Sequence, residues 1–533
     1  MNNDKSRTTT NIILFLCNWG PHAAFQKITD NGGKIPSCIT MVRIPCTGRI
    51  SKALLLKPFE MGADGVALVG CEPGSCRYGP GTITARNNSE DIRGILELLG
   101  LGEERMRLAT FLPDESQELL DFLTEFAGYI SCLEKSPVTP FPKEISFELD
   151  AEEVKDIVTA HDIYSCQDCG KCSSACSLTL AGKDFSPRAM ASSIIAGDCT
   201  STTVQNDVWS CLTCGLCYDR CPSAVNFPDF ICDMRYVLKK GVVKEFDSHG
   251  GFFQSLMRTM TSENLKTKHW NWLPEEIQVD PDSKRYFFGG CAPYFDLFFR
   301  KHLKGQTSNI LVDGLRLLNF FDIVPAIIED ERCCGHDLLW AGNKNSFLKL
   351  ARLNADRMHE LGVEELITAC PECYRTFKHD YPSKGIEVNF KVTHIFDLLE
   401  KEIDKGAIGF EKLDRNITFQ DPCRLSRFEE RADLPRKLIN RLDSDSFNEM
   451  RNNSTSAICC GNSAWTGCDS FSKSLQVKRL KEAHDTGSDL LVTACPKCQI
   501  HLRCAMEDPF LEKELEMEMM DLTSLLANTI RWE

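Results

Sequence analysis

The chain contains Glu-Arg-Cys-Cys-Gly-His at residues 331–336, followed by Ala-Cys-Pro-Glu-Cys at residues 369–373. The same order returns as Ile-Cys-Cys-Gly-Asn at 458–462 and Ala-Cys-Pro-Lys-Cys at 494–498. A lone cysteine precedes each copy, in Gly-Gly-Cys-Ala-Pro and in Asp-Pro-Cys-Arg. One Cys-x-x-Cys means little in a cysteine-rich chain, but a complete pattern that occurs twice in the same order indicates a duplicated domain.

Apolar and helical runs surround both copies in one order: strand, lone cysteine, helix, strand, Cys-Cys-Gly, helix, strand, Cys-Pro-x-Cys, helix. We therefore expect tandem α/β domains over residues 284–402 and 415–530. Each Cys-Pro-x-Cys motif follows a predicted strand and begins a helix. Unpaired backbone N–H groups at a helix start favour thiolate, which is the form of cysteine that binds metal.

The duplicated pattern is the signature of the cysteine-rich CCG domain, and it resembles the catalytic B subunit of heterodisulfide reductase. In that family each five-cysteine set holds a noncubane [4Fe-4S] cluster, and the two clusters face one another and split a disulfide reductively. The resemblance implies the catalytic cysteines Cys291, Cys333, Cys334, Cys370 and Cys373 in the first set, and Cys423, Cys459, Cys460, Cys495 and Cys498 in the second.

The composition limits the class of protein. A length of 533 residues is too great for one ordinary hydrophobic core, and a formal net charge of −15 argues against a nucleic-acid-binding protein. The 28 cysteines could form a disulfide framework, but such frameworks belong to secreted proteins. The early apolar run at residues 12–16 is too short for a secretory signal, and no run reaches the roughly 20 residues of a membrane span. We therefore expect a cytoplasmic protein whose cysteines bind metal.

Residues 10–134 alternate short apolar runs with helical runs, which predicts a small parallel α/β domain. Cys17, Cys46 and the pair Cys71 and Cys76 follow three of the predicted strands. Ligands gather at the carboxyl ends of strands in open α/β sheets. Four thiolates from three loops suit a [2Fe-2S] cluster, and a structural zinc site is the alternative.

The sequence around these cysteines resembles that of the delta subunit of methyl-viologen-reducing hydrogenase. The matching segments are Cys-Asn-Trp at 17–19, Ile-Pro-Cys-Thr-Gly-Arg at 44–49 and Gly-Cys-Glu-Pro-Gly-Ser-Cys at 70–76. The resemblance implies a domain that relays electrons from hydrogenase or formate dehydrogenase into heterodisulfide reductase. That family commonly has Cys-Asn-Trp-Cys, whereas Gly20 stands at the fourth position in this chain. Four thiols remain, which is enough for a binuclear cluster.

Residues 150–242 contain two ferredoxin-like runs of four cysteines. Three cysteines at i, i+3 and i+6 can bind one face of a [4Fe-4S] cubane, and the fourth typically binds the other cluster. This spacing is not that of a zinc ribbon, so we expect two cubanes in an α-helical domain. The block resembles the C subunit of heterodisulfide reductase, which carries electrons. The expected ligands are Cys166, Cys169, Cys172 and Cys176 in the first run and Cys211, Cys214, Cys217 and Cys221 in the second.

Three polar residues lie beside the duplicated pattern. His336 follows the first Cys-Cys-Gly, His501 follows the second Cys-Pro-x-Cys, and Lys497 lies within it. Each could deliver a proton, or could donate a hydrogen bond that tunes a cluster.

No Gly-x-Gly-x-x-Gly follows a predicted strand, so neither flavin nor NAD is expected in a dinucleotide fold. In the resembled assemblies a flavin-containing A subunit connects the delta and C subunits. The resemblance therefore implies an A-like partner, with hydrogenase or formate dehydrogenase as electron source, in a dimeric multisubunit complex.

These resemblances imply a multidomain iron-sulfur subunit with one [2Fe-2S] cluster, two cubanes and two noncubane [4Fe-4S] clusters that cleave a disulfide. Two alternatives stay open. The clusters could only conduct electrons to another enzyme, such as a benzoyl-CoA reductase or a quinone-linked dehydrogenase, or the cysteines could hold zinc in an assembly scaffold. Complete five-cysteine sets in both repeats favour disulfide cleavage.

Overall fold

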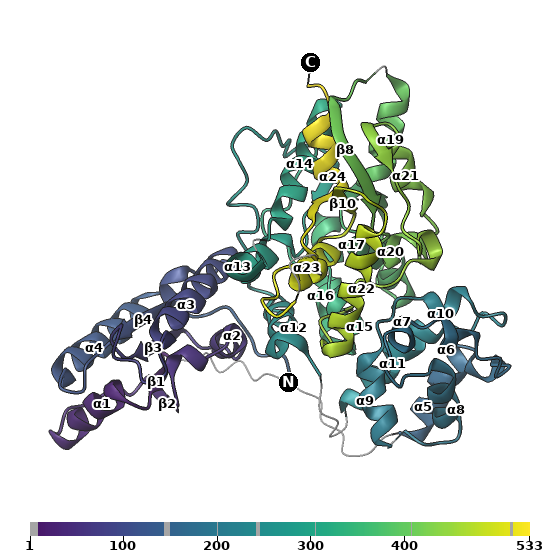
Figure 1. Cartoon of the computed structure of the whole chain (residues 1–533). Coiled ribbons are helices and arrows are strands. Elements are labelled where there is room, and N and C mark those ends of the chain that lie inside the picture. The colour runs from purple at the N-terminus through teal and green to yellow at the C-terminus, as the bar shows by residue number, and fades with distance from the viewer. Residues whose placement is uncertain are drawn as a thin grey trace. The chain divides into compact units, whose positions relative to one another are not determined.

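The computed structural model describes residues 9–142, 150–199, 201–240, 246–303, 305–406, 408–511 and 515–532. Some residues of the predicted domains, such as 241–242 and 512–514, lie outside the described residues. The chain forms two compact units (Figure 1). The first comprises residues 1–142 and 249–271, and the second comprises residues 143–248 and 272–533. Among the described residues, no helix has the length and apolar character needed to span a membrane.

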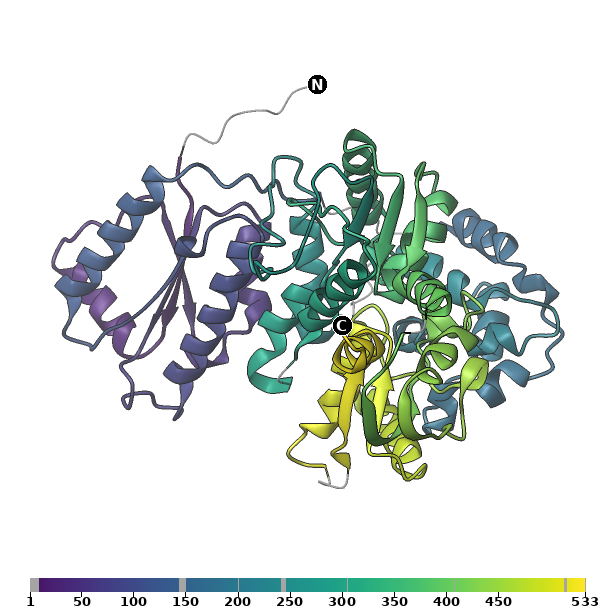
Figure 2. The same cartoon turned by 90° about the horizontal axis from the view of Figure 1, so that it is seen from above.

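A parallel sheet forms the centre of the first unit. Its strands are β1 Ile12–Cys17, β2 Ile39–Ile44, β3 Gly65–Gly70 and β4 Met106–Thr110, in the order β2-β1-β3-β4. The apolar β3 is buried along its whole length because helices cover both faces of the sheet (Figure 2). The covering helices are α1 Gly20–Asp30 and α4 Ser116–Cys132, which pack together, and α2 Lys52–Glu60 and α3 Gly81–Leu98. The parallel α/β class predicted for this region is confirmed.

A distant segment completes the first unit. Residues 241–283 have no clear period, so their sequence predicts only a connector. In the structure, helix α12 Phe252–Thr259 packs against α2. Arg258 Nε lies 2.7 Å from the buried carboxylate of Glu60. Burial alone would raise the pKa of Glu60, but Arg258 and Lys57 outweigh it and hold this pKa below its usual value.

The amino-terminal part of the second unit is helical. Several of its helices are only one or two turns long because a cysteine or a glycine interrupts them. Gly170 and Gly215, for example, take left-handed conformations directly before short helices. The helices are α5 Ala151–Ala160, α6 Lys171–Ala175, α7 Ser177–Leu180, α8 Pro187–Ile195, α9 Thr202–Ser210, α10 Leu216–Asp219 and α11 Phe227–Lys240.

The rest of the second unit contains two parallel sheets, one for each copy of the duplicated pattern. The first sheet has the order β5-β6-β7, with β5 Arg285–Phe288, β6 Glu365–Thr368 and β7 Lys391–His394. The second has the order β11-β10-β8-β9, with β8 Lys412–Phe419, β9 Asp443–Phe447, β10 Leu490–Thr493 and β11 Glu518–Asp521. The predicted α/β class of both repeats is confirmed.

Helices separate these strands as the duplicated pattern predicts. In the first repeat they are α13 Ala292–Leu303, α14 Thr307–Phe320, α15 His336–Trp340, α16 Lys344–Glu360, α17 Pro371–Arg375, α18 Tyr381–Ser383 and α19 Ile395–Lys405. In the second they are α20 Cys423–Ser426, α21 Asp433–Ile439, α22 Ser470–His484, α23 Pro496–Met506 and α24 Leu522–Thr529.

The two repeats differ before their Cys-Cys-Gly segments. The sequence predicts a strand at this point in each repeat, and β9 fills the place in the second. In the first repeat, the corresponding chain makes a single parallel bridge between Ala326 and Tyr286. Each sheet also gains a strand after its Cys-Pro-x-Cys helix, β7 or β11, that the predicted order does not include. Both Cys-Pro-x-Cys motifs nevertheless directly follow a central strand, β6 or β10.

Candidate metal centres

The four predicted thiols of the first unit meet at the carboxyl edge of its sheet. Cys17 ends β1, and its Sγ lies 3.6 Å from Sγ of Cys71. Sγ of Cys46 lies 3.9 Å from Sγ of Cys76. Two thiolates on one tetrahedral metal with bonds of about 2.3 Å lie about 3.8 Å apart, so each pair fits one metal ion. Among these four described residues no other sulfur pair is in contact, and this two-plus-two arrangement fits a binuclear cluster better than a single zinc ion.

Backbone amides surround the Cys17 and Cys71 sulfurs. The N–H groups of Trp19 and Thr47 donate to Cys17, and that of Gly20 donates to Cys71. The hydrogen bond from Cys71 lowers the pKa of Cys17 to about 6, whereas the same bond raises the pKa of Cys71. Gly20 therefore presents an amide to the site at the position where the resembled family commonly has a cysteine.

Two glycines allow the chain to approach the other sulfur pair. A Cβ on Gly81, at the start of α3, would lie 2.7 Å from Cys76 Sγ and 3.0 Å from Cys46 Sγ. A Cβ on Gly48 would collide with Gly81 Cα. Any larger residue at position 81 would therefore displace the two thiols.

The cysteines of the ferredoxin-like runs separate into two groups in the helical part of the second unit. Electrostatic interactions join one group, which consists of Cys176, Cys211, Cys214 and Cys217. The same kind of interaction joins Cys166, Cys172 and Cys221, and Cys172 also acts on Cys217 of the first group. The remaining cysteine, Cys169, is exposed. The last cysteine of each run thus lies with the other run, which is the crossed arrangement expected of a two-cluster ferredoxin-like site.

The chemistry of the first of these groups fits a metal cluster. Its four cysteines line one cavity. Burial and the neighbouring sulfurs raise the pKa values of Cys176 to about 11 and of Cys211 to about 12, and raise that of Cys217 well above its usual value. The hydrogen bond to Cys459 instead lowers the pKa of Cys214 to about 5. The three thiols with raised pKa values can ionise together only if a cation shares their charge, which bound iron would supply.

Each five-cysteine set of the duplicated domains forms one chain of hydrogen-bonded sulfurs. In the first set the order is Cys291, Cys333, Cys334, Cys373 and Cys370. In the second set it is Cys423, Cys459, Cys460, Cys498 and Cys495. The two orders are equivalent, so each repeat folds its five thiols into the same cradle.

The second set is connected to the ferredoxin-like region. Cys459 makes a hydrogen bond to Cys214 as well as to its own set, and these bonds together with burial raise its pKa well above the usual value. The partly buried Arg427 donates to the carbonyl oxygen of Cys214 at 2.7 Å. The second set is therefore the one that lies against a group of predicted cubane ligands.

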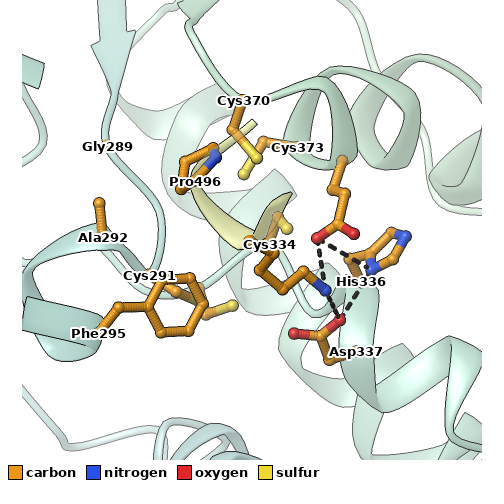
Figure 3. Close-up of a pocket in the computed structure, with 13 residues that line it drawn as sticks. Gly289, Cys291, Ala292, Phe295, Cys334, His336, Asp337, Cys370, Cys373 and Pro496 are labelled. Carbon is orange, nitrogen blue, oxygen red and sulfur yellow. Dashed lines mark hydrogen bonds and ion pairs between the residues drawn. The ribbon is translucent and has the colours of Figure 1, made fainter. Parts of the chain in front are cut away.

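The five thiols of the first set line a small pocket (Figure 3). Gly289, Ala292 and Phe295 form its apolar wall, and Pro496 of the second repeat closes it. The second set lies close by, because the charges of Cys370 and Glu372 both act on Cys495. The pocket is therefore lined by the thiols of the first set and bounded by Pro496 and Lys497, which lie between Cys495 and Cys498 of the second set in the sequence.

A buried polar network crosses from one repeat to the other beside this pocket. Lys497 Nζ of the second repeat lies 2.6 Å from Glu372 and 2.5 Å from Asp337 of the first repeat. Burial alone would lower the pKa of Lys497, but the two carboxylates outweigh it and hold this pKa well above the usual value. Lys497 is therefore a charged ammonium group inside the protein.

The hydrogen bonds of His336 define its protonation. Arg424 Nε lies 3.2 Å from His336 Nε2, and a guanidinium can only donate, so Nε2 must accept. His336 Nδ1 then carries the proton and donates to Asp337 at 2.9 Å. His336 is thus a neutral bridge between two charged groups, which favours the hydrogen-bonding interpretation over that of a proton donor.

Arg424 connects this network to the cubane region. It donates to the carbonyl oxygen of Thr213 at 2.7 Å and to its hydroxyl at 3.1 Å. Thr213 lies between Cys211 and Cys214 and has a φ of 45°, which is unusual for a β-branched residue. Ser463 also hydrogen-bonds its hydroxyl, at 2.8 Å. The ferredoxin-like loop is thus held in a strained conformation by residues of the second repeat.

His501 contacts the second set directly. Its Nδ1 lies 3.3 Å from Cys460 Sγ. Hydrogen bonds from Cys459, Cys498 and His501 lower the pKa of Cys460 well below its usual value. This placement suits a hydrogen-bond donor to a metal-binding sulfur.

Asp337, Glu372 and Arg424 were missed by reasoning from sequence. One signal was available, because Glu372 and Lys497 occupy the same position in the two Cys-Pro-x-Cys motifs and carry opposite charges. Equivalent residues of a duplicated pattern that differ in this way can pair across the interface between the copies. The single sequence gives no similar signal for Arg424, because its partners come from two other parts of the chain.

Comparisons with known proteins agree with this architecture. Residues 12–134 match the family of the methyl-viologen-reducing hydrogenase delta subunit. Residues 148–225 match the 4Fe-4S dicluster domain, and residues 287–378 and 417–503 match the cysteine-rich domain. The fold and the cysteine sets define an iron-sulfur protein with two cysteine-rich CCG domains.

Individual relatives of the chain point to a narrower class of protein. The D subunit of dihydromethanophenazine:CoB–CoM heterodisulfide reductase from Methanosarcina acetivorans is 32% identical over 49% of this chain and 62% of its own length. The B subunit of fumarate reductase (CoM/CoB) from Methanothermobacter marburgensis is 26% identical over 47% of this chain and 48% of its own length. The EtfAB:quinone oxidoreductase of Syntrophomonas wolfei is 26% identical over 43% of this chain and 32% of its own length.

The chain thus spans less than two thirds of the length of these relatives. Over about half of its length the chain is similar to heterodisulfide reductase subunits, and its N-terminal domain matches the family of the hydrogenase delta subunit. The resemblances predicted from its cysteine motifs are confirmed.

Proposed function

We propose that this chain is the disulfide-cleaving iron-sulfur subunit of a multisubunit complex. In this proposal a [2Fe-2S] cluster occupies the first unit, two [4Fe-4S] cubanes occupy the ferredoxin-like region, and two noncubane [4Fe-4S] clusters occupy the duplicated domains. The observation that carries the proposal is the pair of equivalent five-thiol cradles, the first of which lines a pocket that Pro496 and Lys497 of the other repeat complete. A disulfide has two sulfur atoms, and two adjacent cradles could each receive one of them.

The route of electrons follows from the contacts within the second unit. The hydrogen bond between Cys214 and Cys459 supports electron entry from the cubane region into the second set. The first set lies beyond it at the pocket, so we assign it to the substrate end of the route. When bound, the clusters supply one-electron storage, which allows single electrons to be collected for a two-electron cleavage.

The protein residues provide the surroundings for this chemistry. Seven of the ten cradle thiols are buried, and Cys291, Cys370 and Cys423 are partly exposed, so little water reaches the cradles. Lys497 places a permanent positive charge between the two sets. His501 donates toward Cys460, and Arg424 with Arg427 holds the loop of Cys214 against the second set.

The expected partners follow the resembled assemblies. A flavin-containing heterodisulfide reductase A-like subunit would supply electrons, with hydrogenase or formate dehydrogenase as the primary source, in a dimeric complex. The relatives support membership of a multisubunit reductase, because two of them are named as subunits of such enzymes.

A conducting role is the alternative that a specific observation favours. One relative is named as a quinone oxidoreductase that acts on electron-transfer flavoprotein. In that case the same clusters would pass electrons to another enzyme, and the pocket would bind no thiol.

Anaerobic EPR titration of the reconstituted, partly oxidised protein with small thiols and disulfides distinguishes these functions. We expect a thiol-dependent paramagnetic signal in the wild type that Cys333→Ser and Cys459→Ser abolish. Cluster signals that are indifferent to every thiol would refute disulfide cleavage and leave electron conduction. An iron and acid-labile sulfide assay serves as the control for cluster content in each variant.

A further inference from the structure

Lys497 is the one charged donor among the described residues that line the pocket of the first five-thiol set. Its side chain is 5% exposed, and its neighbours in sequence include the predicted ligands Cys495 and Cys498. An ammonium group has three N–H bonds, and Asp337 and Glu372 accept two of them. Beyond the ring of Trp465, whose centroid lies 5.8 Å away, no described residue pairs with the third.

The polar network beside the pocket contributes no net charge of its own. The carboxylates of Asp337 and Glu372 balance the cations Lys497 and Arg424, and His336 is neutral. The predicted metal-binding thiols of the first set carry the remaining charge of the pocket wall. Once the sulfur–sulfur bond breaks, a thiolate appears beside a buried donor that still has a hydrogen bond to give. Such a bond is strong in a site with little water.

We propose that the Lys497 ammonium is the thiolate-binding group of this pocket, a role that rests on the proposed disulfide cleavage. In the balanced reaction a disulfide takes up two electrons from the iron-sulfur clusters and two protons from solvent, and yields two thiols. The sulfur–sulfur bond breaks and no bond to lysine forms. Lys497 keeps its proton and donates a hydrogen bond to a thiolate sulfur until that sulfur is protonated or leaves.

Glu372 has a supporting role in this proposal. It is the equivalent of Lys497 in the other repeat, and it holds one of the ammonium protons at 2.6 Å. In Glu372→Gln the amide oxygen could still accept this proton, but it carries no negative charge and would compete less with a thiolate for the ammonium. Glu372→Gln is therefore expected to bind thiolates more tightly than the wild type, by several-fold.

The test measures thiol binding by anaerobic EPR titration of the cluster-loaded full chain with 2-mercaptoethanol. Lys497→Gln combined with Glu372→Gln removes the ammonium and one carboxylate, so the net charge of the polar network is unchanged. We expect this double variant to bind the thiol about 10- to 100-fold more weakly than Glu372→Gln alone, as for loss of a charge-assisted hydrogen bond. The thioether 2-(methylthio)ethanol cannot form a thiolate and is expected to bind all forms equally weakly.

Lys473→Gln is the matched control. Lys473 lies in the same repeat, is 26% exposed and contacts Asp508 and Cys504, away from the pocket residues. Its substitution is expected to leave thiol binding unchanged.

Three results would overturn the inference. A double variant that keeps its iron and binds 2-mercaptoethanol as tightly as Glu372→Gln would remove Lys497 from thiolate binding while leaving the proposed function intact. If the double variant loses its iron, the single variant Glu372→Gln tests the proposal instead. Thiol binding by that variant that is no tighter than binding by the wild type refutes the proposal. A wild type that gives no thiol-dependent signal refutes both the inference and disulfide cleavage.

Discussion

Arg424 is expected to stabilise the contact between the ferredoxin-like region and the second repeat more than any surface arginine does. Its side chain is 2% exposed and its guanidinium donates to the carbonyl oxygen of Thr213 at 2.7 Å and to His336 Nε2 at 3.2 Å. It also stacks on the rings of Trp340 and Phe428, at 4.0 and 4.5 Å from their centroids.

Arg424→Met would keep the length of the side chain and remove these interactions. Two buried acceptors left without a donor cost about 1.5 kcal/mol each, and two lost cation–π contacts add about 0.5 kcal/mol each. The free energy of unfolding should therefore fall by about 4 kcal/mol. The loss of the clamp on Thr213 should also weaken the magnetic interaction between the cubane and the second five-thiol site.

Two measurements check this expectation. Anaerobic urea unfolding of the cluster-loaded protein gives the stability, and EPR of the reduced protein gives the magnetic interaction. Arg357→Met is the control, because Arg357 pairs with Asp330 at the surface and its side chain is 43% exposed. An Arg424→Met protein as stable as this control, with unchanged EPR splitting, would refute the reasoning.

Two further substitutions test the first unit and the second sheet. Gly81→Ala places a methyl group 2.7 Å from Cys76 Sγ and 3.0 Å from Cys46 Sγ. Iron analysis of this variant should therefore show loss of the first-unit cluster alone. Gly128→Ala is the control, because a methyl group at position 128 meets open space, and it should keep every cluster. Burial raises the pKa of Asp521 to about 7, so the folded protein binds more protons than the unfolded chain between about pH 4 and pH 7. Stability should therefore fall by at most about 4 kcal/mol as pH rises through this window, and Asp521→Asn should flatten the profile in pH-dependent unfolding; an unchanged slope would contradict the assignment.

The cysteine patterns made most of the architecture predictable. A Cys-Pro-x-Cys motif after an apolar run places ligands at a strand end, and the structure has strand β6 or β10 directly before each motif. Duplication of the pattern allowed one repeat to support the interpretation of the other. The strands β7 and β11 were missed, because each is only four residues long and its pattern resembles that of a loop.

The polar network was not predictable for a different reason. Single-sequence patterns report local periodicity, whereas Lys497 and Asp337 are far apart in sequence and meet only when two repeats pack together. A buried lysine looks like any other lysine until its surroundings are known. Thr213 is a similar case, because its unusual backbone is imposed by Arg424 and Ser463 from outside its own motif.

The return of residues 249–271 to the first unit has a consequence for synthesis of the chain. The parallel sheet is complete in sequence by Thr110, yet Glu60 on α2 obtains its partner Arg258 only after the whole ferredoxin-like region has been made. Amino-terminal domains usually fold first while the ribosome is still translating. Here the nascent sheet must wait for the helix that covers α2 and for the arginine that completes the ion pair of Glu60, so a fragment released at Pro142 is expected to be unstable.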